Sequence, residues 1–253
     1  MTTFDHPLFL SLCLFVGLWL FMLIGVALHR LRKLQPDEQQ GFNIILTATL
    51  TLLSLILGFS FSMAITRYDQ RKGYEEAEAN SIGTEYARAE LLPAADADRV
   101  QGLLRQYLQQ RIFFYETGDR QRLPQIDGET LRIQDELWAA VKGEAASQTT
   151  ATAILVMSGM NDVINSQERS QGSWWNRIPT SAWILMTIIA ICSNLLLGFG
   201  GHNVRARPMI FLVLPLVIST AFYLIAEIDS PRSGIIHVVP ENLVSLSQSL
   251  QTR

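Results

Sequence analysis

The chain has 253 residues, of which 49% are hydrophobic and only 17% are charged, and its 20 basic side chains nearly balance 23 acidic ones. An average soluble domain has about a quarter of its residues charged, so this composition argues against an ordinary soluble protein. We expect no nucleic-acid partner.

The charged residues avoid four long apolar windows. Each window is close to the roughly 20 residues that cross a hydrocarbon core of about 30 Å. The windows are Leu8–Leu28, Phe42–Ile65, Ile178–Phe199 and Met209–Ala226. They predict four transmembrane helices, with the lipid bilayer as a partner. The first window could be a cleaved signal peptide, but "MTTFDH" before it has no Lys or Arg and the apolar run is too long, which favours a retained helix.

The second window continues into hydrophilic sequence without a turn signal. If no turn separates Phe42 from Leu92, this stretch is one helix about 75 Å long. The hydrophilic region Arg67–Arg177 is helical in pattern, with further helices at "ADRVQGLLRQYLQQRIFFYE", "GETLRIQDELWAAVKGEA" and "TTATAILVMSGMNDVINSQER". The loops between these three helices are expected at "TGDRQRLPQIDG" and "GEAASQ". The tail has one strand signal, "GIIHVV", and then a short helix opened by Pro240.

These elements predict an all-α membrane protein with four transmembrane helices and a helical extramembrane domain between spans two and three. The expected divisions are 1–66 for the first two spans and 67–177 for the domain, which is continuous with the second span. Residues 178–228 form the last two spans, and 229–253 form the tail.

Small and hydroxyl residues recur along one side of the second span. This stripe comprises Asn43, Thr47, Thr51, Ser54, Gly58, Ser62 and Thr66. Small residues allow close helix packing, and hydroxyls can bond across an interface or back to their own helix. The same stripe could equally face water, and Leu55 and Phe59 beside it could then narrow the pathway and gate it by dewetting.

The segment "LGFSFSMAITRY" resembles the pore helix of bestrophins, anion channels that assemble as homopentamers. Nearly the whole chain is similar to the bestrophin-like membrane proteins of bacteria and plastids, a group without an established function. The similarity rests on "LGFSFSMAITRYDQR", "EANSIGTEYARAELLP", "RIP", "RARP" and "AEIDSPRSG".

The resemblance implies a homo-oligomer, a pentamer if it follows the bestrophins, in a bacterial inner membrane. It implies inorganic ions as partners, with anions slightly favoured, and a hydrophobic neck at Thr51, Leu55 and Phe59. Bestrophins favour bulkier apolar residues than Thr51 there. The long cytosolic tail and acidic calcium clasp of animal bestrophins have no counterpart in this sequence.

Basic residues bear on the orientation in the membrane. Bestrophins keep both termini and the large loop in the cytosol. Short connections weigh most in the positive-inside rule, and here they are the ones that carry Arg30, Arg32, Lys33, Arg205 and Arg207. This favours the termini and the 67–177 domain outside the cytoplasm. Basic residues flank that domain too, at Arg67, Arg71, Lys72 and Arg177, and favour the opposite orientation.

Other candidate sites are weaker. Arg67 lies on the same side of the membrane as Glu227 and Asp229, so these groups could form an ion pair or a charged ring at a pore mouth. The carboxylates of "EEAEANSIGTEY" are expected on a solvated or subunit-facing surface. We predict no enzyme, no cofactor and no metal site. Two functions stay open: an ion channel lined by the second span, and a non-conducting membrane-anchored scaffold or sensor with a helical extracytoplasmic domain.

Overall fold

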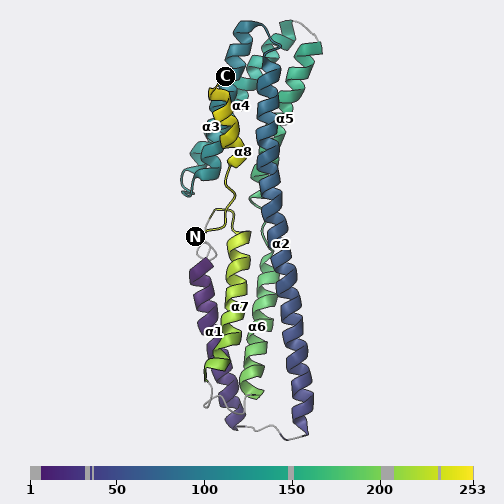
Figure 1. The fold of residues 1–253 in the computed structure, drawn as a ribbon, viewed down its shortest axis with the longest axis vertical. Helices are drawn as coiled ribbons and strands as arrows, with labels where there is room; N and C mark the ends of the chain where they lie inside the picture. Colours follow the sequence, from purple (N-terminus) through teal and green to yellow (C-terminus); the bar gives the residue numbers. More distant parts are fainter. Residues whose placement is uncertain are drawn as a thin grey trace. The chain divides into compact units, whose positions relative to one another are not determined.

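The computed structural model describes residues 7–31, 35, 37–147, 151–200, 208–232 and 235–252, and within these residues it contains helices and no strand. The helices are α1 (Pro7–Leu31), α2 (Glu38–Ala89), α3 (Ala94–Glu116), α4 (Leu123–Ser147), α5 (Ala151–Ser173), α6 (Thr180–Gly200), α7 (Pro208–Asp229) and α8 (Glu241–Gln251) (Figure 1). The predicted all-α fold class is confirmed.

Helix α2 is one helix of 52 residues, about 78 Å long. It contributes to both compact units into which the chain divides. Four helices are long and apolar enough to cross a membrane, in agreement with the four predicted spans: α1, α2, α6 and the Phe211–Asp229 part of α7. In α2 the charge-free segment Phe42–Ile65 is the part that can lie in lipid.

The first unit, residues 1–67 and 177–237, contains α1, the first part of α2, α6 and α7. Helix α1 lies along both α6 and α7 (Figure 1). At the crossing of α1 and α6 two glycines face the opposing backbone: a Cβ on Gly25 would lie 2.1 Å from the Leu195 oxygen, and one on Gly198 would lie 2.0 Å from the Met22 oxygen. Because any larger side chain would collide with backbone there, these glycines allow the close helix packing typical of membrane interiors.

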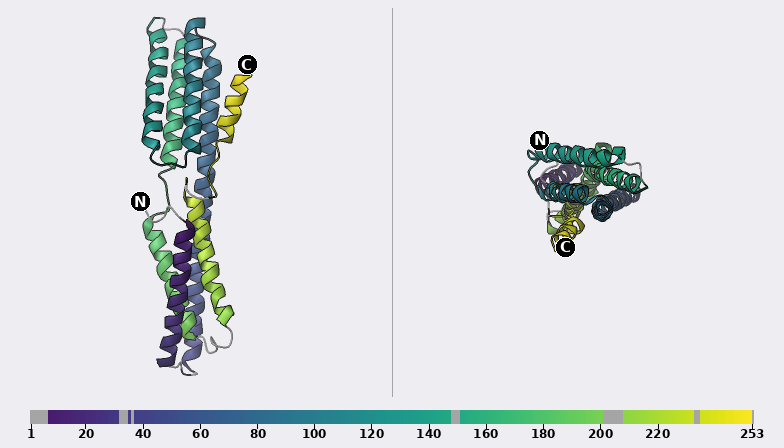
Figure 2. Two further views of the ribbon diagram at one scale, coloured as in Figure 1. Left: turned by 90° about the vertical axis from the view of Figure 1, so that its left-hand side faces the viewer. Right: turned by 90° about the horizontal axis from the view of Figure 1, so that it is seen from above.

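The second unit, residues 68–176 and 238–253, contains the rest of α2 with α3, α4, α5 and α8 (Figure 2). Its apolar core draws on every one of these helices, for example through Ile82, Leu104, Leu137, Met160 and Leu243. Helix α8 therefore packs with this unit, whereas residues 229–237 of the tail group with the first unit.

Four local expectations are wrong. Helix α2 ends at Ala89 rather than Leu92, and the loop expected at "GEAASQ" is helical as far as Ser147. Helix α4 begins at Leu123 rather than Gly128, because Pro124 falls in its first turn, where a proline costs no helical hydrogen bond. The described tail residues Ile235–Val239 form no strand, since no neighbouring strand offers them a ladder of hydrogen bonds in the described part of the chain.

Candidate functional site

One side of α2 is buried in the first unit. Phe42, Leu53, Ser60 and Ala64 are the buried positions of its membrane-spanning part, and they recur at multiples of about 3.6 residues, as one face of a helix requires. Phe42 packs against Phe199 of α6, with 5.8 Å between the ring centroids.

The predicted stripe lies on the opposite side of α2. At about 100° per residue, its positions centre roughly half a turn away from the buried ones. All are exposed in the protomer: Thr47, Thr51, Ser54, Gly58, Ser62 and Thr66, together with Leu55 and Phe59. Phe59 is 65% exposed and Leu55 is 53% exposed. Two bulky apolar side chains therefore lie free on this face, one turn apart.

Three hydroxyl groups of the stripe bond to their own helix. Thr51 Oγ1 donates to the Thr47 carbonyl oxygen at 2.8 Å, Ser54 Oγ donates to the Thr51 oxygen at 2.8 Å, and Thr66 Oγ1 donates to the Ser62 oxygen at 2.9 Å. Such bonds satisfy the hydroxyl hydrogen without an interhelical partner. A Cβ added to Gly58 would meet nothing within 4 Å, so the protomer itself does not use this small residue for close packing. The face is left for lipid, water or another copy of the chain.

The three charged candidates at the end of the first unit are not joined to one another in the described residues. Asp229 accepts hydrogen bonds from the Ile178 N–H with both carboxylate oxygens, each at 3.1 Å, just before α6 begins. Glu227 accepts one from the Ile235 N–H. Arg67 contacts the Met63 sulfur at 3.6 Å, and no ion pair joins it to Glu227 or Asp229. The two buried carboxylates thus bind backbone N–H groups, one before α6 and one after α7.

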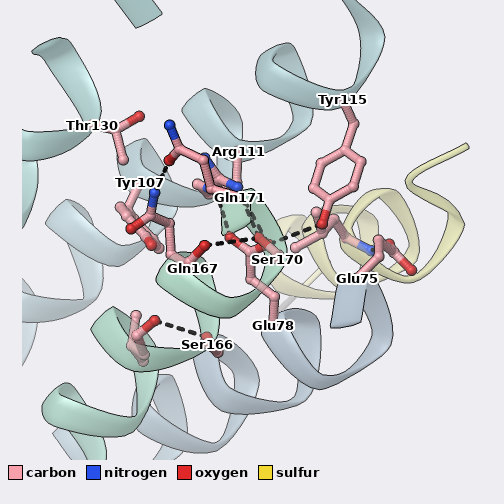
Figure 3. Close-up of polar contacts among 12 residues, drawn as sticks. Glu75, Glu78, Tyr107, Arg111, Tyr115, Thr130, Ser166, Gln167, Ser170 and Gln171 are labelled. Atoms are coloured by element: carbon pink, nitrogen blue, oxygen red, sulfur yellow. Dashed lines mark hydrogen bonds and ion pairs between the residues drawn. The ribbon is translucent and has the colours of Figure 1, made fainter. Parts of the chain in front are cut away.

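A buried polar cluster in the second unit was missed by the sequence analysis (Figure 3). The Glu78 carboxylate of α2 accepts hydrogen bonds from Arg111 of α3, from Tyr115 OH at 3.2 Å and from Ser170 Oγ of α5 at 2.9 Å. The Arg111 guanidinium is fully buried and also lies 4.4 Å from the Phe114 ring centroid. Burial opposes its charge, but the Glu78 charge outweighs this and raises the pKa of Arg111. These contacts of Glu78 and Arg111 tie three helices together.

Two further charged groups of α2 bind helix ends. Arg71, 1% exposed, donates to the Ser173 carbonyl oxygen at 3.4 Å and to the Asn176 oxygen at 3.0 Å, at the C-terminal end of α5. Glu75 accepts from the Leu243 N–H at 2.9 Å and from the Asn242 amide at 2.6 Å, at the N-terminal end of α8. Each charge has the sign that complements the helix dipole at its end. Burial raises the pKa of Glu75 in spite of these bonds.

The expectation of a solvated acidic surface on this part of α2 is therefore wrong for Glu75, Glu78 and Glu85, all of which are buried. The available signal was their spacing. Together with Arg71 and the apolar Ile82 they recur every three or four residues, which is the pattern of one inward helical face. Among the described residues, no three His, Cys, Asp or Glu side chains are close enough to hold a metal ion.

Comparisons with known proteins identify the fold. A family model described as a bestrophin-like domain matches residues 13–243. Three crystal structures of a bacterial bestrophin homolog from Klebsiella pneumoniae are similar to the chain. One, with a tyrosine-to-alanine substitution, has a TM-score of 0.69 at 14% identity and covers 95% of this chain and 97% of its own. One with a tryptophan-to-alanine substitution has a TM-score of 0.68 at 15% identity, over 96% and 94%.

The third, obtained by Zn-SAD phasing, has a TM-score of 0.67 at 14% identity and covers 96% of this chain and 97% of its own. At such identities the likeness concerns the fold. No protein among the curated sequences matches the chain.

Proposed function

The chain belongs to the bestrophin-like family, and from this premise we propose that it is a homo-oligomeric ion channel lined by the membrane-spanning part of α2. The pore would be built by the exposed stripe of several copies, a pentamer if it follows the bestrophins. Its narrowest part would be a hydrophobic neck of Thr51, Leu55 and Phe59. Inorganic ions are its partners, with anions slightly favoured, and it has no enzymatic activity.

One observation carries the proposal. The face of α2 that is free in the protomer is the face that bears the polar stripe and the two exposed apolar side chains, Leu55 and Phe59. Backbone-bonded hydroxyls keep oxygen lone pairs available for water or ions. Rings of Leu55 and Phe59 would obstruct ions, because an ion cannot shed its water there without replacement ligands.

The same hydrogen bonds favour a second candidate, a non-conducting membrane-anchored scaffold or sensor. Hydroxyls already satisfied by their own helix can also pack against lipid or against another helix without forming a wet surface. In that case the spans would anchor and assemble the chain, and the helical domain would carry the function.

Phe59→Ala separates the two candidates. Widening and wetting the neck should raise the conductance of the reconstituted oligomer in planar bilayers. Phe9→Ala is the matched control, because Phe9 is a similarly exposed phenylalanine on another span, α1, which does not line the proposed pore. Assembly is checked by mass measurement of each preparation. An intact oligomer that passes no current as wild type or as Phe59→Ala would leave the scaffold or sensor as the function.

The orientation belongs to the same proposal: an inner-membrane protein with its termini and the large helical domain outside the cytoplasm. The basic residues that support it include Arg32, Lys33, Arg205 and Arg207, which lie outside the described residues. In a background without Cys13 and Cys192, single cysteines at Gln121 and Gln35 are tested with an impermeant thiol reagent on intact cells. Labelling at position 121 alone supports the orientation, and labelling at position 35 alone reverses it.

A further inference from the structure

Glu85 is the one buried acid of α2 that the described contacts leave without a hydrogen bond. Its side chain is 0% exposed, and neither carboxylate oxygen has a partner. The nearest cation is Arg88, whose Nη1 lies 4.0 Å from Oε2, beyond hydrogen-bonding distance. Glu85 belongs to the second unit. It lies about 30 Å along the helix from Ile65, where the apolar segment of α2 ends.

Helix α5 is shaped around this carboxyl group. Gly159 faces it, and a Cβ there would lie 1.8 Å from Glu85 Oε2 and 2.5 Å from Arg88 Nη1. Gly159 lies within the regular helix α5, where any residue can adopt the backbone conformation, so the backbone does not require a glycine there. Its lack of a side chain instead provides the space that the Glu85 head group occupies.

The protonation state of Glu85 follows from this setting. A buried carboxylate without N–H or O–H donors is strongly disfavoured, whereas the neutral acid costs much less. Burial raises the pKa of Glu85 to about 8, Arg88 opposes that rise, and Asp162 of α5 adds to it. Glu78, two turns earlier, is buried just as deeply but accepts hydrogen bonds from three side chains. The difference between the two acids lies in their donors.

Solvent comes close to this group at the contact between α2 and α5, which we call the seam. A groove of about 490 Å³ runs between α2 and α5, lined among others by Ser81 and Asp162. Ser81 lies one turn before Glu85, and Asp162 lies about one turn after Gly159. The groove thus lies about one helical turn from the buried carboxyl group.

We propose that Glu85 is a proton-binding site that couples pH to the packing of α5 on α2: the neutral acid holds the seam closed, and loss of its proton loosens it. The charged groups around it are Arg88 on α2 and Asp162 on α5. The folded chain keeps a proton that the unfolded chain has lost between pH 4.5 and about 8. Stability therefore falls as the pH rises through this window and levels off above it. This inference does not depend on ion conduction.

The first test is infrared spectroscopy of the full-length protein in detergent. The difference between about pH 6 and about pH 9, which brackets the pKa, should contain the C=O stretch of a buried protonated carboxyl group. The band should vanish in Glu85→Gln and persist in Glu76→Gln, an exposed acid on the same helix. No such band in the wild type, or a band that survives Glu85→Gln, overturns the proposal.

Two neighbouring substitutions should move the midpoint of this titration in opposite directions. Arg88→Gln removes the charge that favours the carboxylate and should raise the midpoint. Asp162→Asn removes the charge that opposes it and should lower the midpoint. Equal midpoints in both variants would show that Glu85 is not the titrating group, and this comparison holds even if Glu85→Gln does not fold.

The coupling to packing has its own measurement. Amide hydrogen exchange in Ala151–Ser173, corrected for its intrinsic pH dependence, should accelerate above the midpoint in the wild type and stay slow in Glu85→Gln. Exchange that is independent of the Glu85 protonation state would overturn the coupling.

Discussion

The two halves of α2 differ in the residues that their buried side carries. In the membrane-spanning half the buried positions are mostly apolar or small, such as Leu53 and Ala64, and the hydroxyl-bearing stripe is exposed. In the extramembrane half, buried positions at the same three-to-four spacing carry full charges: Arg71, Glu75 and Glu78. The buried face of this one helix is thus mostly apolar in the first unit and charged in the second.

The difference shows how the available partners decide where a polar group can lie. Charges inside the helical domain find donors and acceptors on α3, α5 and α8, so each of the three is bonded. In hydrocarbon no such partners exist, and a hydroxyl uses the carbonyl of its own helix instead. Glu85 is the exception among the buried charged residues of the extramembrane half, because no donor reaches its carboxyl group. For this reason we propose it as a site for a proton.

The largest expected effect comes from breaking the charged face. Arg111→Met should lower the free energy of unfolding by about 3–5 kcal/mol, because it leaves the Glu78 carboxylate buried and unpaired. The measurement is chemical or thermal unfolding of the detergent-solubilised protein. The double variant Glu78→Leu/Arg111→Met should recover much of the loss, since no lone charge remains.

Arg132→Met supplies the control for that experiment. Arg132 pairs with Glu129 and Glu136 on the surface of α4, where water screens the charges, so its loss should change stability little. Equal destabilisation by Arg111→Met and Arg132→Met would contradict the account of the buried pair.

A smaller effect should distinguish the two sides of the membrane-spanning half. Leu53→Ala, at a position 2% exposed, should cost about 2–5 kcal/mol through lost packing and a cavity. Leu55→Ala, on the free face, should leave the stability of the protomer nearly unchanged and alter only assembly or conductance. Unfolding and mass measurement of both variants check this. A larger loss of stability for Leu55→Ala would mean that the free face is packed within the protomer.

The smallest effect should come from a hydroxyl of the stripe. Thr66→Val removes the bond to the Ser62 carbonyl oxygen, which retains its place in the helical backbone ladder, so stability should change by about 0.5 kcal/mol or less. The same unfolding measurement applies. A loss well above 1 kcal/mol would indicate that Thr66 has a partner on another helix or another subunit.

Much of the fold follows from the sequence alone. Window length and the absence of charge determine the four spans, because the thickness of the hydrocarbon core and the cost of burying a charge are the same for any chain. Since helix geometry is local, the lack of a turn signal between Phe42 and Leu92 likewise predicts one long helix, which the structure ends three residues earlier, at Ala89. The stripe from Thr47 to Thr66 follows from spacing for the same reason.

Only the tertiary structure decided which side of α2 is covered, and by what. The acids Glu75, Glu78 and Glu85 have the same residue type and a shared register, yet one holds the start of α8, one pairs with Arg111, and one faces Gly159 without a donor. Those outcomes depend on residues between 33 and 168 positions away along the chain. Burial and hydrogen bonding are properties of contacts between distant segments. The periodicity of one helix shows which face is buried but does not identify the residues that will pack against it.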